Sequence, residues 1–402
     1  MKQRYRYRLY PNEGQAQRLA QMFGCSRVVW NDALSECRRL YGQGEKYPGF
    51  AALAKQMITE AKRTVERSWL ADVSVVPLQQ SVRNLDVAFG NFFASVTGKR
   101  KGPKVRMPRF KRRSNTQSAE FTQRGFKLGQ KLTLAKIGSI KVQWSRELPS
   151  EPSSVTVIKN AAGQYFASFV VEVKPKLLPW ADKDIGIDLG VTTFATLDDG
   201  TKVDAPKPLK RYQRKLVRLQ RKLAKCEKGS NRRKRAVLAV AKVHARIKDI
   251  RTDFLHQLST RLIRENQSIS LEDLNVSGMV KNRCLAKAIS DLGWRQFRTL
   301  LEAKAEIYGR EVAVISRWEP TSQMCSCCGH REGRKKLSVR DWQCLNCGVL
   351  HERDVNAAKN IKVAGGYSET KNGRRRTGKS SSLAQSGDAS SQPYEEQLTL
   401  CF

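Results

Sequence analysis

The sequence predicts an α+β multidomain protein, in which a small β-barrel interrupted by helices precedes an α/β domain that contains a cysteine module. Three observations lead to this prediction. Short alternating runs flank a section with helical spacing, strands and helices then follow one another from residue 184, and two cysteine pairs precede the last helical run. A chain of 402 residues is long enough for several such domains.

Two separate parts of the sequence carry the two-residue period of half-buried strands. In residues 3–9, Tyr5, Tyr7 and Leu9 alternate with arginines. Residues 118–175 show similar alternation in short runs separated by glycines, and residues 153–173 predict a hairpin. We expect these strands to close one β-barrel, formed by residues 1–10 and 98–180.

A helical section separates the two parts of the barrel. Apolar residues recur at helical spacing over residues 19–37 and again over 78–93, which predicts core-forming helices. We therefore expect an inserted helical domain over residues 11–97. Residues 98–114 form a basic stretch with glycine and proline, too irregular for a helix.

The second half of the chain has a different pattern. Three short strands from residue 184 are followed by a basic helical stretch (209–263, interrupted at 229–231), then by a strand, a helix, a strand and a final helix. This order is the one expected of an RNase H-like fold, which we place at residues 181–323 and 349–365. Residues 366–402 are rich in Ser, Gly, Gln and Arg, so we expect a disordered tail.

The charge of the chain predicts a polyanionic partner. Lys and Arg number 75 against 37 Asp and Glu, a formal net charge of +38. Self-repulsion of this size is relieved when nucleic acid neutralises the charges. Residues 206–251 carry Lys and Arg throughout with few acids, which favours a channel wall that contacts nucleic-acid backbone over a merely solvated helix. No apolar run predicts a membrane span or a secretion signal, so we expect an intracellular, cytoplasmic protein.

Two carboxylates lie on the polar faces of predicted strands. In residues 185–190, Asp188 shares its face with Gly186 and Gly190, which leaves a shelf where a phosphate backbone can approach closely. Glu272 lies opposite the apolar face of residues 269–271. Residues 275–293, which follow Glu272, are expected to form a flexible basic flap that gates the substrate.

A third carboxylate, Asp354, begins the last predicted helix. Its helix has apolar positions three, four and seven residues later, so the face that packs on the sheet also brings Asp354 towards it. Three acids in this arrangement predict a nuclease site for two divalent cations, Mg²⁺ or Mn²⁺.

Four cysteines have the spacing of a tetrahedral zinc site. The pairs Cys325/Cys328 and Cys344/Cys347 are separated by fifteen residues, and a glycine follows each pair. We expect a structural Zn²⁺ at these four thiolates, because four protein ligands leave no position open for catalysis. Rival ligands nearby are Cys327, His330 and His351, and they are interpreted as non-ligands. The other five cysteines are expected in the core or on the surface: Cys25, Cys37, Cys226, Cys284 and Cys401.

Together these motifs resemble one family. GIDLG (186–190), LEDL (271–274), the two CxxCG knuckles and HERDVNAAKNI (351–361) resemble the RuvC-like half of the TnpB family, nucleases encoded by insertion sequences and related to type V CRISPR effectors. The LYPN start, the GPKVRMPRFKRR loop and residues 290–310 also match. The resemblance covers about residues 3–365.

The resemblance implies a fold, a reaction and partners. The barrel would be a wedge domain and residues 11–97 a recognition domain, followed by a RuvC-like nuclease domain and an inserted zinc ribbon at 324–348. The implied activity is RNA-guided cleavage of double-stranded DNA beside a short transposon-adjacent motif, with a guide RNA transcribed from the transposon end. The implied metal acids are Asp188, Glu272 and Asp354, and the implied location is the prokaryotic cytosol or nucleoid. Relatives commonly read DRD where this chain reads Glu352-Arg353-Asp354, and the metal-binding second acid is present.

Two other functions compete with this one. A nuclease-inactive, RNA-guided repressor would be favoured by loss of one of the three acids, and none is lost. A DNA transposase is disfavoured by the helical insertion and by the cysteine module between the second and third acids.

Overall fold

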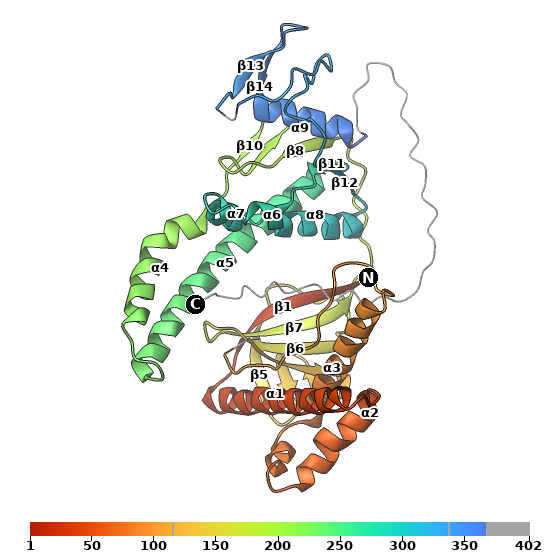
Figure 1. Ribbon diagram of the computed structural model, residues 1–402, viewed down its shortest axis with the longest axis vertical. Coiled ribbons are helices and arrows are strands. Elements are labelled where there is room, and N and C mark those ends of the chain that lie inside the picture. The colour runs from red at the N-terminus through yellow and green to blue at the C-terminus, as the bar shows by residue number, and fades with distance from the viewer. Residues whose placement is uncertain (115, 337, 367–402) are drawn as a thin grey trace.

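The computed structural model describes residues 1–114, 116–336 and 338–366, which form two sheets with their helices, a helical arm and a small cysteine module (Figure 1). The tail predicted over residues 366–402 falls, apart from Gly366, outside the described residues. Within the described part of the chain, the search for a helix both long and apolar enough to span a bilayer found none.

The first sheet is antiparallel and has the order β2-β6-β7-β1-β5-β4-β3. Its strands are β1 (Lys2–Tyr10), β2 (Gln117–Thr122), β3 (Phe126–Leu128), β4 (Lys131–Leu134), β5 (Gly138–Gln143), β6 (Ser154–Lys159) and β7 (Tyr165–Glu172). The central strand is β1, paired with β7 and β5, so the first strand joins the later ones as predicted. Tyr7 and Leu9 are buried, while Arg4 and Arg6 are exposed, as the alternation predicts.

The two edge strands of this sheet follow one another in the chain. Only the 3-10 turn Gln123–Gly125 separates β2 from β3, so the sheet curls until its edges approach. Each edge strand is paired on one side, β2 with β6 and β3 with β4, and no ladder between β2 and β3 is among the described pairings. The predicted barrel is therefore a half-barrel that curls without closing by hydrogen bonds.

The helical insertion lies between β1 and β2. It contains α1 (Glu13–Gly42), α2 (Gly49–Ala54), the π-helical turn η1 (Lys55–Glu60), the 3-10 turns η2 (Ala61–Arg63) and η3 (Ser68–Asp72), and α3 (Val75–Val96). α1 begins with a capping box, because Gln15 N donates to Asn12 Oδ1 (2.9 Å) and Asn12 N donates to Gln15 Oε1 (3.1 Å). The buried faces of α1 and α3 belong to the same hydrophobic core as the sheet. The insertion and the half-barrel are thus stabilised together.

Residues 98–114 form an irregular connection, as predicted, and part of it is held on α1. Trp30 Nε1 donates to the carbonyl of Arg109 (3.1 Å), and Lys111 N donates to Asn31 Oδ1 (2.8 Å). The basic loop therefore has a defined path over the helical insertion.

The second sheet has the order β10-β9-β8-β11-β12. Its strands are β8 (Asp184–Asp188), β9 (Ala195–Leu197), β10 (Lys202–Val203), β11 (Ser268–Glu272) and β12 (Glu311–Ile315). The strands β8, β11 and β12 run parallel, and β9 and β10 complete the sheet antiparallel. The helices α5 (Asn231–Glu265) and α8 (Trp294–Tyr308) cover one face and α9 (Arg353–Ala364) covers the other (Figure 1). The predicted order of strands and helices is observed.

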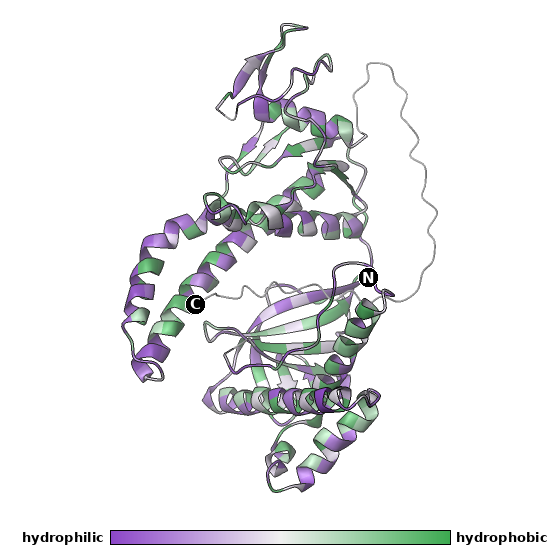
Figure 2. Ribbon diagram, viewed as in Figure 1, coloured by the Kyte–Doolittle hydropathy of each residue, from purple (hydrophilic) through white to green (hydrophobic). Residues whose placement is uncertain are grey.

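A helical arm projects from this sheet. It consists of α4 (Pro208–Ala224) and the first half of α5, joined by a short turn at the predicted interruption. Leu216 and Leu223 of α4 pack against Val240, Val243 and Ile247 of α5, so these apolar side chains form the contact between the two helices. Figure 2 shows hydrophilic residues alternating with hydrophobic ones along both helices of the arm.

The segment after Glu272 contains two short helices, α6 (Val276–Met279) and α7 (Ala286–Leu292), where a flap was predicted. Its end is anchored, because the buried carboxylate of Asp291 accepts hydrogen bonds from the backbone N–H groups of Leu209 (2.9 Å) and Lys210 (3.2 Å). These N–H groups lie in the first turn of α4. Lys207, the residue before the helix, makes no side-chain capping hydrogen bond. Asp291 therefore caps the arm from a distant part of the sequence.

Candidate carboxylate and cysteine sites

Asp188 and Glu272 end two neighbouring parallel strands. The register pairs Ile187 of β8 with Leu271 of β11, so the next position along both strands brings Asp188 beside Glu272. Alternation along each strand puts both carboxylates on the face opposite the buried isoleucine and leucine side chains. The strand ends and the register together juxtapose the first two predicted acids.

Helix α9 packs on that same face of the sheet. A Cβ atom on Gly186 would lie 2.0 Å from the carbonyl oxygen of Ala358, so α9 can approach β8 only because this position is glycine. At the other end of the helix, a Cβ atom added to Gly365 would lie 2.0 Å from Ser270 Oγ of β11. The first turn of α9 carries Asp354 and thereby brings the third acid to the ends of β8 and β11.

The contact at Gly186 corrects one expectation. The sequence predicts that this glycine leaves a shelf for a phosphate backbone, but the shelf is occupied by the backbone of α9. Gly190 likewise faces the carbonyl of Thr193, where an added Cβ would lie at 2.8 Å. Both glycines allow close packing within the protein, and the expectation that they expose Asp188 to a phosphate is wrong.

The three acids influence one another electrostatically. Burial, followed by the nearby charges of Glu272 and Asp354, raises the pKa of Asp188 to about 7, and Arg353 and Arg340 act in the opposite direction. Like charges held this close in a partly desolvated site favour protonation of one member or binding of a cation. The arrangement fits a divalent cation through its oxygen ligands and through the repulsion that a cation would relieve.

Two of the acids also accept hydrogen bonds from side chains of this chain that the sequence analysis did not identify. Thr321 Oγ1 donates to Glu272 Oε1 (2.6 Å), and Arg340 Nη1 donates to both oxygens of Asp354 (3.2 Å each). Thr321 is buried, and its carbonyl accepts a hydrogen bond from Asn360 Nδ2 of α9 (2.7 Å). The sequence offers one sign of the contact with Thr321: two amide residues, Asn356 and Asn360, lie one helical turn apart in the last predicted helix. Both are buried in the structure.

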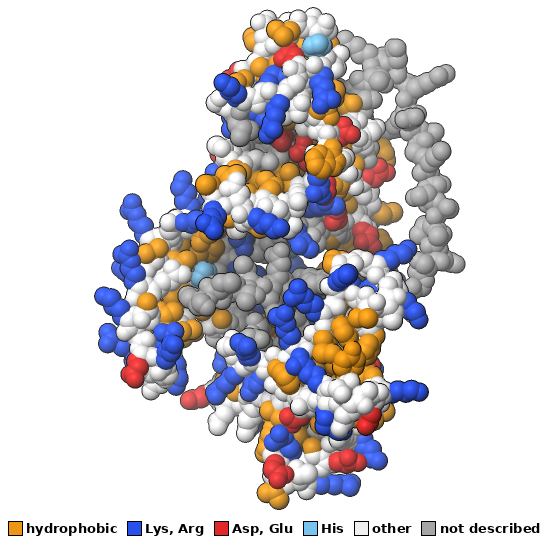
Figure 3. Space-filling model, in the orientation of Figure 1, with side chains coloured by type: hydrophobic (Ala, Val, Ile, Leu, Met, Phe, Trp, Pro, Cys, Tyr) orange, Lys and Arg blue, Asp and Glu red, His pale blue; other side chains and the backbone are white. Residues whose placement is uncertain are grey.

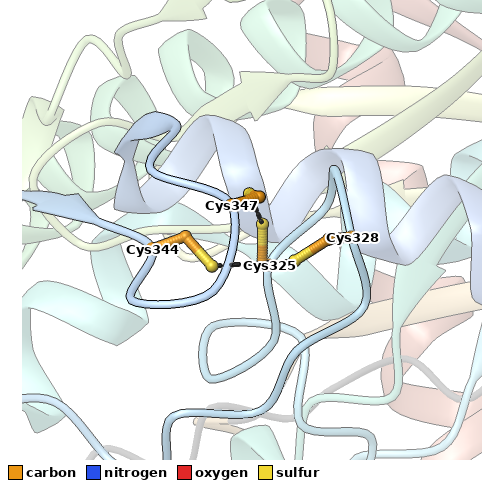
Figure 4. Close-up of side chains that lie close together, drawn as sticks. All are labelled: Cys325, Cys328, Cys344 and Cys347. Carbon is orange, nitrogen blue, oxygen red and sulfur yellow. Dashed lines mark hydrogen bonds between the residues drawn. The ribbon is translucent and has the colours of Figure 1, made fainter.

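The four predicted cysteines form a compact cluster between β12 and α9 (Figure 4). Their sulfur atoms all lie within 4.8 Å of one another, with Cys325 Sγ 3.7 Å from Cys347 Sγ and Cys328 Sγ 3.6 Å from Cys344 Sγ. Such a cluster is typical of a zinc ribbon. Cys344 and Cys347 lie between β13 (Asp341–Gln343) and β14 (Leu350–Glu352), and Cys325 and Cys328 lie in a separate turn bounded by the Met324–Arg331 bridge. Among the described residues, the three carboxylates do not form so compact a set.

The turns of this module have the geometry that the CxxCG pattern requires. Gly329 and Gly348 have φ of +75° and +71°, the left-handed region that glycine adopts without strain. His351 Nε2 lies 3.0 Å from Cys325 Sγ, close to the cluster but outside the set of four, and His330 and Cys327 are exposed. The three rival ligands thus lie outside the set of four, and His351 is placed to donate a hydrogen bond to Cys325 Sγ.

Basic side chains line two surface depressions. One, of about 480 Å³, lies between α5 and the β6–β7 turn and is lined in part by Arg8, Lys242 and Arg246. The other lies on α4 and is lined by Lys210, Gln213, Arg214, Val217, Arg218 and Arg221. Figure 3 shows many Lys and Arg side chains on the visible face of the arm, with hydrophobic side chains between them.

Comparison with known proteins identifies the family. The chain is 44% identical, over 91% of its length and 90% of the relative's, to a "Putative RNA-guided DNA endonuclease" of Streptomyces pristinaespiralis. It is 32% identical, over 90% of its length and 92% of the relative's, to the "Putative RNA-guided DNA endonuclease InsQ" of Escherichia coli K12. The chain belongs to the TnpB family. The predicted resemblance is thereby confirmed.

Family profiles match three parts of this TnpB-family chain. Residues 168–283 match a profile described as "Probable transposase", residues 294–361 one described as "Cas12f1-like, TNB domain", and residues 1–46 one described as "Helix-turn-helix domain". In this structure residues 1–46 form strand β1 and the single continuous helix α1. The cysteine cluster lies inside the second of these matches.

Among solved structures, the chain is similar to a Cas12f1–sgRNA–target DNA complex, with a TM-score of 0.49 and 14% identity over 85% of this chain and 81% of the other. A Cas_phi3 structure gives a TM-score of 0.47 and 10% identity over 91% and 92% of the two chains.

Proposed function

We propose that this protein is an RNA-guided DNA endonuclease that hydrolyses phosphodiester bonds at Asp188, Glu272 and Asp354. One observation carries the proposal: the β8–β11 register and the packing of α9 bring carboxylates from three distant stretches of sequence to the ends of the parallel strands β8 and β11. The two relatives named "Putative RNA-guided DNA endonuclease" and "Putative RNA-guided DNA endonuclease InsQ" support it.

The side chains around the acids would prepare them for catalysis. Bound Mg²⁺ or Mn²⁺ ions would activate the attacking water and stabilise the leaving 3′-oxygen, giving a 5′-phosphate. Thr321 fixes the orientation of Glu272, and Arg340 holds Asp354 at the start of α9. Asp188 is ionised most readily when positive charge is nearby, because burial and its two acidic neighbours raise its pKa.

The architecture supports an assignment of separate roles to four proposed domains. We assign residues 1–10 and 98–180 to a wedge domain, 11–97 to a recognition domain, 181–323 and 349–365 to a RuvC-like nuclease domain, and 324–348 to a zinc ribbon. A structural Zn²⁺ at the four cysteines would fix the ribbon between β12 and α9, so the ribbon would also fix the distance between Thr321 and Asp354.

The proposed partners are a guide RNA transcribed from the transposon end and a double-stranded DNA target beside a short transposon-adjacent motif. The depression on α4 and the many Lys and Arg side chains of the arm suit contacts to phosphates, which carry affinity without reading sequence. With 75 Lys and Arg against 37 acids, the chain has ample positive charge for both nucleic acids.

The proposal is tested with the protein and its co-expressed RNA on a plasmid library of randomised flanks, with and without Mg²⁺. Cleavage should need Mg²⁺ and one flanking motif, and Asp188→Ala should bind the target without cutting it. An RNA-guided repressor would bind without cutting in the wild type, and a transposase would purify without a bound RNA of defined length. Either result would replace the proposed function.

A further inference from the structure

Trp318 is the most exposed of the seven tryptophans, with 86% of its surface accessible. An isolated exposed apolar residue is ordinary on protein surfaces and carries no meaning alone. The position of Trp318 is the informative feature, because it lies in the turn directly after β12, next to the strand that ends at Glu272.

The turn that carries Trp318 is attached to the carboxylate strand on both sides. Before the tryptophan, Ile315 is paired with Glu272 in the sheet, and Arg317 makes an ion pair with Asp273. After it, Thr321 Oγ1 donates to Glu272 Oε1 (2.6 Å). Trp318 is therefore exposed on a turn whose two ends are both fixed to the strand carrying the second acid.

The turn is also closed internally. Glu319 N donates to the carbonyl of Ser316 (3.1 Å), and Trp318 N donates to Ser316 Oγ (3.3 Å). Because the backbone of this turn is already ordered, little conformational entropy is lost when the Trp318 ring binds a partner. The ring is therefore a suitable stacking surface.

The surroundings of Trp318 favour a nucleobase as its partner. Arg317 and Arg298 flank Asp273, and Arg340 lies at Asp354, so arginines accompany the acids at this end of the sheet. A single DNA strand offers the matching chemistry, a flat apolar base beside a phosphate, and an indole accepts any base because each has a π-face. An apolar protein partner would gain nothing from the adjacent charges.

We propose that Trp318 stacks on one base of the DNA strand being cut and so holds the neighbouring phosphate at the three acids. This inference rests on the proposed nuclease function and deepens it. Trp318 is a positioning residue: it contacts the substrate next to the reacting phosphate, takes no part in proton transfer, and is indifferent to sequence.

The test uses the complete ribonucleoprotein and a single-stranded DNA complementary to its guide. Trp318→Ala should lower kcat/KM by roughly 5- to 150-fold, the range that stacking of one base supports. Trp318→Phe should restore most of the rate, because it keeps an aromatic face. Leu345→Ala is the matched control, since Leu345 in the cysteine module is an apolar residue with nearly the same exposure, 87%, and it should cut at the wild-type rate.

A second arm separates stacking from a general structural role. Abasic sites placed one at a time near the cut should slow the wild type at one position and leave Trp318→Ala unaffected there. Target binding, measured in an Asp188→Ala background, should change less than the cutting rate.

Three outcomes would overturn the stacking proposal: unchanged cutting by Trp318→Ala, equal sensitivity of both proteins to every abasic site, or a change of oligomeric state with unchanged cutting. If the wild type fails to cut, or Asp188→Ala cuts, the nuclease function itself fails. If Asp188→Ala is inactive while Trp318→Ala is fully active, only the stacking role fails.

Discussion

Thr321 Oγ1 donates a 2.6 Å hydrogen bond to Glu272 Oε1, across 49 residues of sequence. Thr321 lies four residues before the first cysteine of the cluster, and its carbonyl is held by Asn360 of α9. A single residue thus connects the cysteine module, the closing helix and the second acid. The cysteine module is therefore positioned to influence the geometry of the carboxylates.

Replacing Thr321 should weaken metal binding at the acids. Thr321→Val keeps the shape but removes the hydroxyl donor, so Glu272 loses its fixed orientation, and apparent Mn²⁺ affinity should fall by about 10- to 100-fold. Thr321→Ser should behave like the wild type because it retains the donor. Metal titrations of cleavage would measure the effect, and equal titrations for Val and Ser would contradict it.

The protonation of Asp188 should be visible in the stability of the metal-free protein. Its pKa is raised to about 7, mainly by burial, above the value near 3.9 expected in the unfolded chain. Between these values the folded state holds the proton more tightly, so this residue makes stability fall as pH rises from about 4 to about 7 and adds no further change above it.

Asp188→Asn removes this dependence. In a chelator, it should melt a few degrees above the wild type at pH 8 and near the wild type at pH 4. Adding Mn²⁺ at pH 8 should raise the melting temperature of the wild type and not of the variant. A variant less stable than the wild type at pH 8 would show that Asp188 is not a destabilising charge.

The four cysteines should bind one zinc ion per chain and stabilise the fold through it. Cys344→Ser should lose the zinc, measured by elemental analysis, and should lower the melting temperature, because a structural metal contributes directly to folding. Cys327→Ser is the matched control: Cys327 lies in the same module, exposed and outside the cluster. Equal zinc content in both variants would contradict the assignment.

The cap on the helical arm should contribute to stability. Asp291→Ala leaves the first N–H groups of α4 without their acceptor, which should cost about 1–2 kcal/mol in urea unfolding. Asp291→Asn should lose less, since the amide oxygen still accepts a hydrogen bond. Identical unfolding midpoints for wild type and Asp291→Ala would exclude the capping role.

The arm should carry salt-dependent, sequence-independent affinity. Replacing Arg214, Arg218 and Arg221 with Gln should weaken binding of every target alike, and should flatten the dependence of log affinity on log salt by roughly 0.9 for each phosphate that the arm no longer neutralises. Lys55→Gln, on η1 where Lys55 pairs with Glu60, should leave the slope unchanged. A change limited to some target sequences would indicate base reading instead.

Local patterns in the sequence by themselves determined the strands and helices and the residues that form the cysteine cluster. The alternation in residues 3–9 predicts β1, the interruption at residues 229–231 predicts the break between α4 and α5, and the spacing of four cysteines predicts the cluster that is observed. These predictions succeed because strand period, helix period and knuckle spacing depend on residues within a few positions of one another.

Only the tertiary structure determined the contacts between residues that lie far apart in the sequence. The β8–β11 register brings Asp188 beside Glu272, Gly186 admits α9 where a phosphate was expected, and Asp291 caps a helix 82 residues away. The hydrogen bond from Thr321 to Glu272 and the open edge between β2 and β3 also depend on contacts between distant segments. Strand register and helix packing are chosen by burial over the whole chain, so no short stretch of sequence contains the information.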